Sequence, residues 1–331
     1  MNVIINNGTF SNVYYNKILK MVEKHTYLYD NSFILLSNNI KELFFLCLLK
    51  EYIFENIPET LYKYNHIILY NNKIKILYPY KGKTLNNFKF SLPIIFDILK
   101  AIHFLHYNEI SHGDIKPNNI LVNKNDAILI DYGSVCFNHN EEYYNRCTLY
   151  YISPEELLQQ KFLVSTDIWS VGCTIYEYYT KRTFIIDLIG KSIFSFKKLK
   201  YYFNTKITQE KINDLLDKNI KEYFILDLLK KMLIIDVNNR CKIDDLLFLK
   251  KKYPVKLHLK ELKNLFFNII NISEYEEINN KEEMCSIIDD IIINNKIISI
   301  KKEQIKSLIN LLCIIPKLLY KLRMDIVKNV I

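Results

Sequence analysis

Residues 110–122 read ISHGDIKPNNILV and residues 130–133 read IDYG, and these two stretches are the most informative part of the sequence. Within the first, Asp114 and Lys116 lie two residues apart in a predicted loop that leads into a short apolar run. The Asp114 carboxylate can orient an attacking hydroxyl or accept its proton. The Lys116 ammonium supplies positive charge where a transferred phosphoryl group needs it.

Two further polar residues flank the next apolar runs. Asn119 follows five residues after Asp114, and Asp131 ends the second stretch of apolar residues. Their amide and carboxylate oxygens are hard ligands of the kind that Mg²⁺ prefers, since this ion binds a few protein oxygens together with water and phosphate. The four residues together predict a site for phosphoryl transfer.

The two stretches resemble the catalytic loop, H-R-D-x-K-P-x-N, and the D-F-G motif of eukaryotic-type protein kinases. Residues 148–155, TLYYISPE, resemble the end of the activation segment of that family, and residues 167–173, DIWSVGC, resemble its D-x-W-S-x-G helix. The resemblance implies that Asp167 holds the backbone of the catalytic loop and that Arg240 pairs with Glu155. The ordered set of motifs is far more specific than any one of them alone.

The resemblance implies an α+β fold with two lobes, a small β-rich N-lobe over residues 1–80 and a larger helical C-lobe over residues 81–253. It also implies ATP and Mg²⁺ in the cleft between the lobes, and a protein substrate with a serine or threonine acceptor. The site roles carried over are catalytic for Asp114 and Lys116, and metal-binding for Asn119 and Asp131. Residues 254–331 lie outside the motifs, and their amphipathic patterns predict a helical extension that either packs on the C-lobe or docks a partner.

Local patterns place these motifs on secondary structure. Strands are expected over residues 2–7, 13–15, 18–22, 67–70, 74–78, 120–122 and 127–130. Helices are expected over residues 39–54 and 93–105, and again between the D-x-W-S-x-G motif and about residue 250.

The nucleotide-binding residues of the N-lobe match the family less closely. Residues 6–13, NNGTFSNV, align with the phosphate-covering loop, which implies nucleotide contacts for Gly8 and Val13 although only the middle glycine of the family pattern is present. A glycine there permits close approach of the backbone to phosphates. The lysine that contacts the phosphates is expected at Lys20, because strand alternation puts it on an inward face. Lys17 is the alternative, since the preceding hairpin is short.

Three further expectations follow from the resemblance. Residues 37–42, SNNIKE, are similar to the P-S-T-A-I-R-E helix of cyclin-dependent kinases, so Glu42 is expected to pair with the phosphate-contacting lysine. A cyclin-like regulatory protein could bind the same helix. The adenine-binding hinge is expected at residues 78–82, YPYKG, with backbone contacts from Pro79 and Lys81.

One departure from the family concerns regulation. Gly113 replaces the arginine of H-R-D, which in the family commonly clamps a phosphorylated residue of the activation loop. We therefore expect activity that does not require phosphorylation of that loop. Two alternatives to a protein kinase remain, namely a pseudokinase that serves as a binding scaffold and a small-molecule phosphotransferase of the choline or aminoglycoside type. The Lys116-Pro117 pair and the two downstream motifs favour a protein substrate.

Composition narrows the class of protein. Half of the 331 residues are hydrophobic and 24% are charged, which excludes a disordered tail protein. The seven cysteines form no C-x-x-C pair, and neither a membrane span nor a secretory signal is expected, so the sequence predicts an intracellular protein. The net charge of +9 fits the codon bias of an A/T-rich genome, such as that of a large DNA virus or an intracellular parasite. Nucleic acid is not expected as a partner.

Overall fold

The computed structural model describes residues 2–7, 11–27, 42, 45, 46, 49, 57–70, 73–136, 148–159 and 164–246. The described residues form two compact units. The first contains the residues up to 57 together with residues 63–80, and the second contains residues 58–62 and the residues from 81 onward. The first is rich in strands and the second in helices, which confirms the predicted α+β fold of a small β-rich lobe and a larger helical lobe. The predicted extension over residues 254–331 lies outside the described residues.

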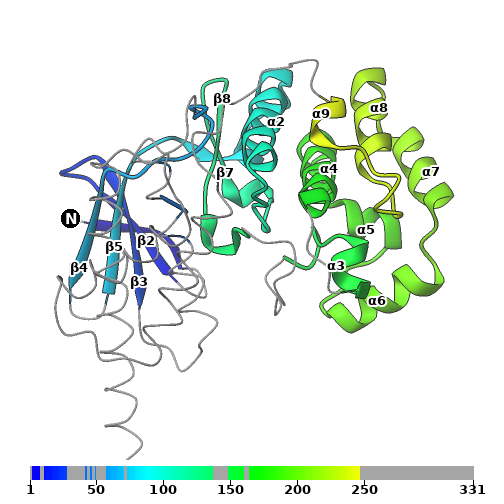
Figure 1. The fold of residues 1–331 in the computed structure, drawn as a ribbon, viewed down its shortest axis with the longest axis horizontal. Coiled ribbons are helices and arrows are strands. Elements are labelled where there is room, and N and C mark those ends of the chain that lie inside the picture. The colour runs from blue at the N-terminus through cyan, green and yellow to red at the C-terminus, as the bar shows by residue number, and fades with distance from the viewer. Residues whose placement is uncertain are drawn as a thin grey trace, which may run out of the picture. The chain divides into compact units, whose positions relative to one another are not determined.

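The first unit contains a five-stranded antiparallel sheet with strand order β1-β2-β3-β5-β4 (Figure 1). Its strands are β1 (Asn2–Asn7), β2 (Ser11–Asn16), β3 (Met21–Tyr27), β4 (His66–Tyr70) and β5 (Lys73–Pro79). Residues 42, 45, 46 and 49 are helical and buried, as expected for one face of a helix at a spacing of three and four residues.

The turn between β2 and β3 corrects one prediction. Residues 18–20 were expected in a strand, but residues 17–20 form an exposed four-residue turn between paired residues Asn16 and Met21. The Asn16 side chain closes the turn, because its Oδ1 accepts hydrogen bonds from the backbone N–H groups of Ile18 (3.1 Å) and Leu19 (3.0 Å). Lys20 has a φ of 50°, which no strand residue adopts. The expectation that strand alternation directs Lys20 inward is therefore wrong.

The central strand β3 carries a buried charge, Glu23, on the face opposite Lys24, and both neighbouring strands contact it. Glu23 is 0% exposed and accepts hydrogen bonds or ion pairs from Asn16 (2.8 Å), Lys75 (2.8 Å) and His25 (3.0 Å). Burial opposes ionisation of the Glu23 carboxyl, but these partners outweigh it and lower its pKa from 4.5 to about 2. The sheet thus depends on an ionised carboxylate in its interior.

The second unit begins with a small antiparallel sheet of β6 (Lys83–Thr84), β7 (Ile120–Asn123) and β8 (Asp126–Leu129). Gly82 has a φ of 110°, and a Cβ there would lie 2.0 Å from the Val122 carbonyl oxygen, so only glycine fits where the chain meets β7. Helix α2 (Leu92–Tyr107) packs against β8 and buries Ile95, Leu99 and Ile102. Although the predicted N-lobe includes residues 58–62, they belong to this unit, because Tyr62 N donates to Leu129 O and Leu129 N to Thr60 O.

Helices make up the rest of the second unit, as expected. They are α3 (Pro154–Gln159), α4 (Val164–Thr180), α5 (Phe184–Ile189), α6 (Phe196–Thr205), α7 (Gln209–Asn219), α8 (Tyr223–Met232) and α9 (Ile243–Leu246). Short 3-10 turns occupy Leu85–Asn87, Pro117–Asn119 and Tyr132–Ser134. Helix α4 is the core element, because Trp169, Tyr176 and Tyr178 are fully buried on it. Among the described helices, none is long and apolar enough to cross a membrane.

Candidate active site

The Asp114 carboxylate is the centre of a cluster of polar side chains. Its Oδ2 accepts hydrogen bonds from Lys116 Nζ (2.7 Å) and Asn119 Nδ2 (3.0 Å), and its Oδ1 accepts one from Thr148 Oγ1 (2.9 Å). Lys116 Nζ also donates to Thr148 Oγ1 at 2.7 Å. The Asp114 and Lys116 side chains are 12% and 22% exposed, so solvent reaches both. An ionised carboxylate, an ammonium and a hydroxyl therefore meet at a position open to a reactant.

The backbone of the catalytic loop is held from α4, as the sequence predicted. Asp167 accepts hydrogen bonds from the backbone N–H groups of His112 (2.7 Å to Oδ2) and Gly113 (2.9 Å to Oδ1). His106 on α2 contacts the same carboxylate, with Nε2 3.0 Å from Oδ2. Asp167 is 1% exposed, so its carboxylate interacts with these groups and not with solvent. His106 thus helps to hold the carboxylate that positions the catalytic loop.

His112 connects the loop to the residue before Asp131. Its Nδ1 accepts a hydrogen bond from the Asp114 N–H at 3.3 Å, so the ring proton lies on Nε2, which contacts the Ile130 carbonyl oxygen at 3.1 Å. The ring is 0% exposed. His112 therefore braces the catalytic loop against the residue before Asp131.

Asn119 and Asp131 lie next to each other across the start of the small sheet. Ile130 N donates to Asn119 O at 2.9 Å, directly after the Ile120–Leu129 pair of β7 and β8. The Asn119 amide nitrogen is held by Asp114, so its carbonyl oxygen Oδ1 is directed away from that carboxylate. Asp131 is exposed and has a φ of 66°, which takes its side chain out of the strand direction. The backbone thus places Asn119 and Asp131 at the same end of the small sheet.

Tyr132, which stands at the phenylalanine position of D-F-G, is anchored by its hydroxyl. The hydroxyl donates to Leu129 O at 2.8 Å and accepts from Tyr62 N at 2.7 Å, while Tyr62 N also contacts Leu129 O at 3.1 Å. Tyr132 is 1% exposed and its ring lies edge-on to His112 at 5.8 Å. The segment after Asp131 is thereby tied to β8 and to residues 58–62. These bonds could not be predicted from the D-F-G motif, because the phenylalanine of that motif has no hydroxyl.

Gly113 cannot be replaced without strain in this loop. Its φ is 78°, and a Cβ would lie 2.5 Å from the Ser134 carbonyl oxygen. The glycine therefore allows the catalytic loop to approach residue 134 closely. An arginine of the family type is excluded by this geometry.

The end of the activation segment is fixed by a buried ion pair, as predicted. Arg240 donates to both oxygens of Glu155 at 2.6 and 2.8 Å, and its guanidinium lies 5.3 Å from the Trp169 ring centroid. Tyr151 donates to Glu177 at 2.7 Å, and burial together with that carboxylate raises the pKa of the Tyr151 hydroxyl well above its usual value. These contacts hold the chain that carries Thr148 beside Asp114.

In the first unit, the lysine that meets the helix glutamate is Lys24. Its Nζ lies 2.7 and 2.9 Å from the two Glu42 oxygens, and the two side chains are 14% and 3% exposed. Lys24 pairs directly with Val13 across β2 and β3, so the two residues share one face of the sheet. The predicted partner of Glu42 was Lys20, with Lys17 as the alternative, and both lie in the exposed turn instead.

The remaining predicted nucleotide residues are placed as follows. Pro79 ends β5 opposite Met21 and is half-buried, while Lys81 is exposed in the next segment. Gly8 lies outside the described residues. The sequence did contain a signal for Lys24. On a strand that begins after the Asn16 turn, Val22 and Lys24 are two residues apart and therefore lie on the same face.

Comparison with known proteins identifies the family. The protein kinase domain family matches residues 69–253, more than half of the chain, and the chain belongs to this family. Among curated relatives, it is 29% identical over 190 residues to mitogen-activated protein kinase mpkC of Aspergillus fumigatus, covering 48% of each chain. It is 40% identical over 103 residues to human dual specificity tyrosine-phosphorylation-regulated kinase 4, which is 29% of this chain and 20% of the relative.

Other relatives agree with this assignment. The chain is 42% identical over 88 residues to mouse cyclin-dependent kinase-like 5, covering 25% of this chain and 9% of the relative. The matches thus span less than half the length of these curated relatives. A solved kinase-domain crystal structure matches the fold with a TM-score of 0.57 at 20% identity, over 75% of this chain and 94% of that chain.

Proposed function

We propose that this chain is a serine/threonine protein kinase, which transfers the γ-phosphoryl group of ATP to serine or threonine hydroxyls of proteins. The observation that carries the proposal is the Asp114 carboxylate, held within 3.0 Å of Lys116, Asn119 and Thr148 in a chain of the protein kinase family. Such catalysis consists mainly of positioning and charge stabilisation, which these groups supply.

The acceptor hydroxyl is oriented by Asp114. The carboxylate already accepts a hydrogen bond from the Thr148 hydroxyl at 2.9 Å, which shows that a β-hydroxyl donor fits beside it. A substrate hydroxyl would use the remaining acceptor capacity and direct its oxygen towards the phosphorus. Lys116, 2.7 Å from the carboxylate, would neutralise charge on the migrating phosphoryl group.

The donor set at Asn119 and Asp131 fits Mg²⁺. Among the described residues there is no cluster of three or more His, Cys, Asp or Glu side chains that could hold a metal alone. One carboxylate and one amide oxygen are what Mg²⁺ takes from a protein when phosphates and water complete its shell. The ion would shield the negative charge of the phosphates. Asp131 and Asn119 would hold it, and Asn119 would also keep Asp114 in place through its amide nitrogen.

The nucleotide contacts of the first unit form the second part of the proposal. Lys24, fixed by Glu42, would bind the phosphates in place of the predicted Lys20 or Lys17. Val13 shares its face of the sheet and would pack on the nucleotide. Gly8 at the phosphate-covering loop, and Pro79 and Lys81 at the hinge, keep the contacts that the family resemblance implies.

A protein substrate is favoured over a small molecule. The Lys116–Thr148 hydrogen bond joins the catalytic loop to the segment that a peptide substrate would meet, and the curated relatives are protein kinases. The hydrogen bonds from Lys116 and Asn119 to the Asp114 carboxylate support an active enzyme over a scaffold without activity. An intracellular location and a cyclin-like partner at residues 37–42 remain part of the proposal, on the strength of the family resemblance.

The test is transfer of radiolabelled phosphate from ATP to a generic basic protein. Asp114→Asn is expected to lower the rate at least ~100-fold, because the amide cannot accept the hydroxyl proton. Asp214→Asn, which removes an exposed carboxylate on α7, is the matched control and should leave the rate unchanged. Equal rates for the native protein and Asp114→Asn would refute the catalytic assignment. Consumption of ATP with choline or an aminoglycoside, but not with protein, would favour the small-molecule alternative.

A further inference from the structure

We infer that helix α6 and the segment before it form a docking surface for acidic stretches of the protein substrate. This α6 surface consists of the exposed side chains between Lys191 and Lys206. The inference deepens the proposed function and rests on it, because it assigns a substrate class to the same site.

The α6 surface carries only positive charge. Residues 188–209 contain five lysines and no aspartate or glutamate. All five lysines are exposed, namely Lys191, Lys197, Lys198, Lys200 and Lys206. Within the described residues, none of them takes part in an ion pair. By contrast, Lys230 and Lys231 on α8 pair with Asp217 and Asp227 at 2.7 Å. The charge of the α6 surface is therefore available to a partner.

Aromatic side chains lie among these lysines. Phe194 is 88% exposed and Tyr201 is 55% exposed, whereas Leu199 and Phe203 on the opposite face of α6 are buried. Lys191 and Lys206 lie 5.6 and 5.9 Å from the ring of Tyr202. A peptide that combines acidic groups with an extended backbone would meet both charge and apolar contact here.

The charges do not serve the stability of α6 itself. Lys197 and Lys198 lie in the first turn, where the helix dipole favours acidic residues, and no acidic residue is present there. The N-cap residue Ser195 makes no side-chain hydrogen bond to the helix. The first turn thus carries charges of the unfavourable sign with no compensating contact that stabilises the helix, and such departures are typical of functional sites.

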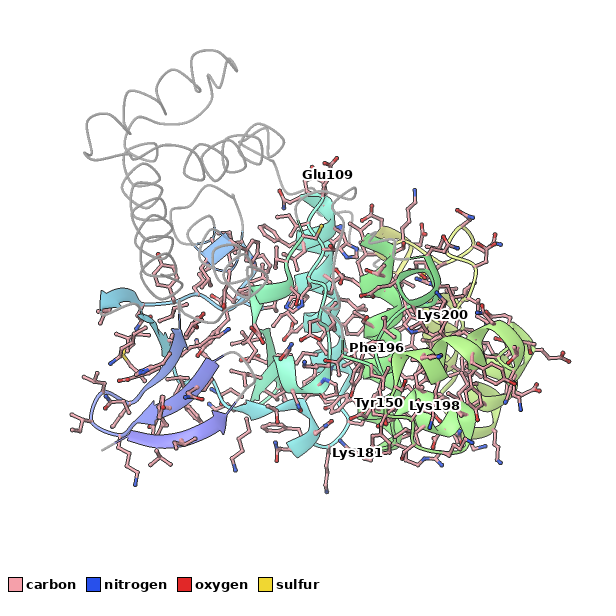
Figure 2. The ribbon with its side chains drawn as sticks, turned by 90° about the horizontal axis from the view of Figure 1, so that it is seen from below. Glu109, Tyr150, Lys181, Phe196, Lys198 and Lys200 are labelled. Atoms are coloured by element: carbon pink, nitrogen blue, oxygen red, sulfur yellow. The ribbon has the colours of Figure 1, made fainter. Side chains whose placement is uncertain are left out.

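Hydrogen bonds connect the α6 surface to the catalytic cluster. Thr148 donates to the Asp114 carboxylate at 2.9 Å, and Tyr150, two residues further, donates from its hydroxyl to Ile193 O at 2.5 Å. Ile193 directly precedes the exposed Phe194. Helix α3, which follows the same segment, packs on α6 (Figure 1). Figure 2 shows Tyr150, Phe196, Lys198 and Lys200 in the same part of the second unit. The segment that carries Thr148 beside Asp114 is therefore anchored next to the first residues of the α6 surface.

The length of the helix sets the design of the peptide. Ten residues of helix span ~15 Å, and an extended chain rises ~3.3 Å per residue, so a run of about five acidic residues matches α6. Two pairs of serine peptides are compared, with five glutamates on either the N-terminal or the C-terminal side of the acceptor. In each pair the control peptide carries five glutamines instead.

The native protein is expected to phosphorylate one of the acidic peptides with a kcat/KM about 10-fold higher than its glutamine control, mainly through a lower KM. The preference should weaken in ~0.5 M salt, since the charges are exposed. The triple variant Lys197→Glu, Lys198→Glu, Lys200→Glu should lose the preference and keep its rate on the glutamine peptide. Its Tm should not fall, because glutamate at positions 197 and 198, in the first turn, favours the helix.

The matched control reverses three other exposed lysines, Lys211, Lys218 and Lys221, and so makes the same change in net charge. It should keep the preference. Equal kcat/KM for acidic and glutamine peptides in the native protein, or equal loss in both triple variants, would overturn the inference. A basic surface can also bind nucleic acid, so binding of single-stranded RNA is measured as well. The inference would be overturned if the native protein showed no peptide preference and the α6 variant lost RNA binding. If the proposed function itself fails, no peptide is phosphorylated in an Asp114-dependent way, which is a different result.

Discussion

Two lysine–carboxylate pairs with the same 2.7 Å separation lie in the two units of this protein, and they are built in different ways. Lys116 and Asp114 are two residues apart in one loop. Lys24 and Glu42 are 18 residues apart and come from a strand and a helix. The first pair is fixed by the local path of the chain. The second depends on where a strand begins, so a single change in turn length would bring another side chain to the glutamate.

The largest effect is expected at the second pair. Lys24→Met should lower phosphoryl transfer ~100-fold or more, because the phosphates lose their cation. Lys20→Met, four residues earlier in the exposed turn, should leave the rate within about twofold. The rates are measured with radiolabelled ATP, and the affinity for ATP is measured on the same samples by calorimetry.

Loss of folding must be separated from loss of the contact. Removal of one partner of a buried pair can cost ~3–5 kcal/mol, because the Glu42 carboxylate stays behind without Lys24. The Tm of each variant is therefore recorded, and Lys24→Arg, which retains the charge, should fold even if Lys24→Met does not. An active Lys24→Met together with an inactive Lys20→Met would show that the register of β3 is wrong.

The contrast between the two pairs also explains what the sequence could predict. The residues around Asp114 were predictable because they lie close together in one stretch of sequence, and the Asp167 and Glu155–Arg240 contacts were implied by the resemblance to protein kinases. Lys24 was missed because the position of a strand residue follows from the length of the turn before it. That length is set here by the Asn16 side chain, which caps two backbone N–H groups and lets Lys20 adopt a positive φ.

A second kind of residue could not be predicted from motifs. The Tyr132 hydroxyl and the buried Glu23 network lie outside the motifs, and they depend on which side chains meet across strands and loops. Alternation predicts that Glu23 and Lys24 face opposite sides of β3, but not that Lys75 and His25 would surround the carboxylate. Such contacts become visible only once the register is known.

The next largest effect concerns the Glu23 network in the first unit. The pKa of Glu23 is about 2 in the folded protein and about 4.5 when unfolded, so the folded state binds fewer protons. The stabilisation is present above pH ~4.5 and is lost as the pH falls towards 2, and it amounts to at most about 3 kcal/mol.

Glu23→Gln should therefore lower the free energy of unfolding at pH 7 and flatten its decrease between pH 4.5 and 2. Urea unfolding at a series of pH values measures both. Glu210→Gln, which changes an exposed glutamate on α7, is the control. An identical pH profile for Glu23→Gln and the native protein would contradict the proposed role of the charge.

A smaller effect is expected at Tyr132 in the second unit. Tyr132→Phe removes the hydrogen bonds to Leu129 O and from Tyr62 N, but Tyr62 N keeps its contact with Leu129 O. We expect a loss of ~1 kcal/mol in the free energy of unfolding. Tyr201→Phe, which changes an exposed hydroxyl, should have no effect in urea titrations. A loss above ~3 kcal/mol would show that more than these two bonds depends on the hydroxyl.

The smallest effect is expected where the catalytic loop itself departs from its family. With a φ of 78° and the Ser134 carbonyl 2.5 Å from any added Cβ, position 113 cannot supply the arginine that receives a phosphate. Treatment of the purified protein with a phosphatase should therefore change phosphoryl transfer by less than about twofold. Mass spectrometry confirms that phosphate has been removed, and a sample with inhibited phosphatase is the control. A complete loss of activity would mean that another cation orders the activation segment, and the comparison between the two units would then have to include regulation as well as geometry.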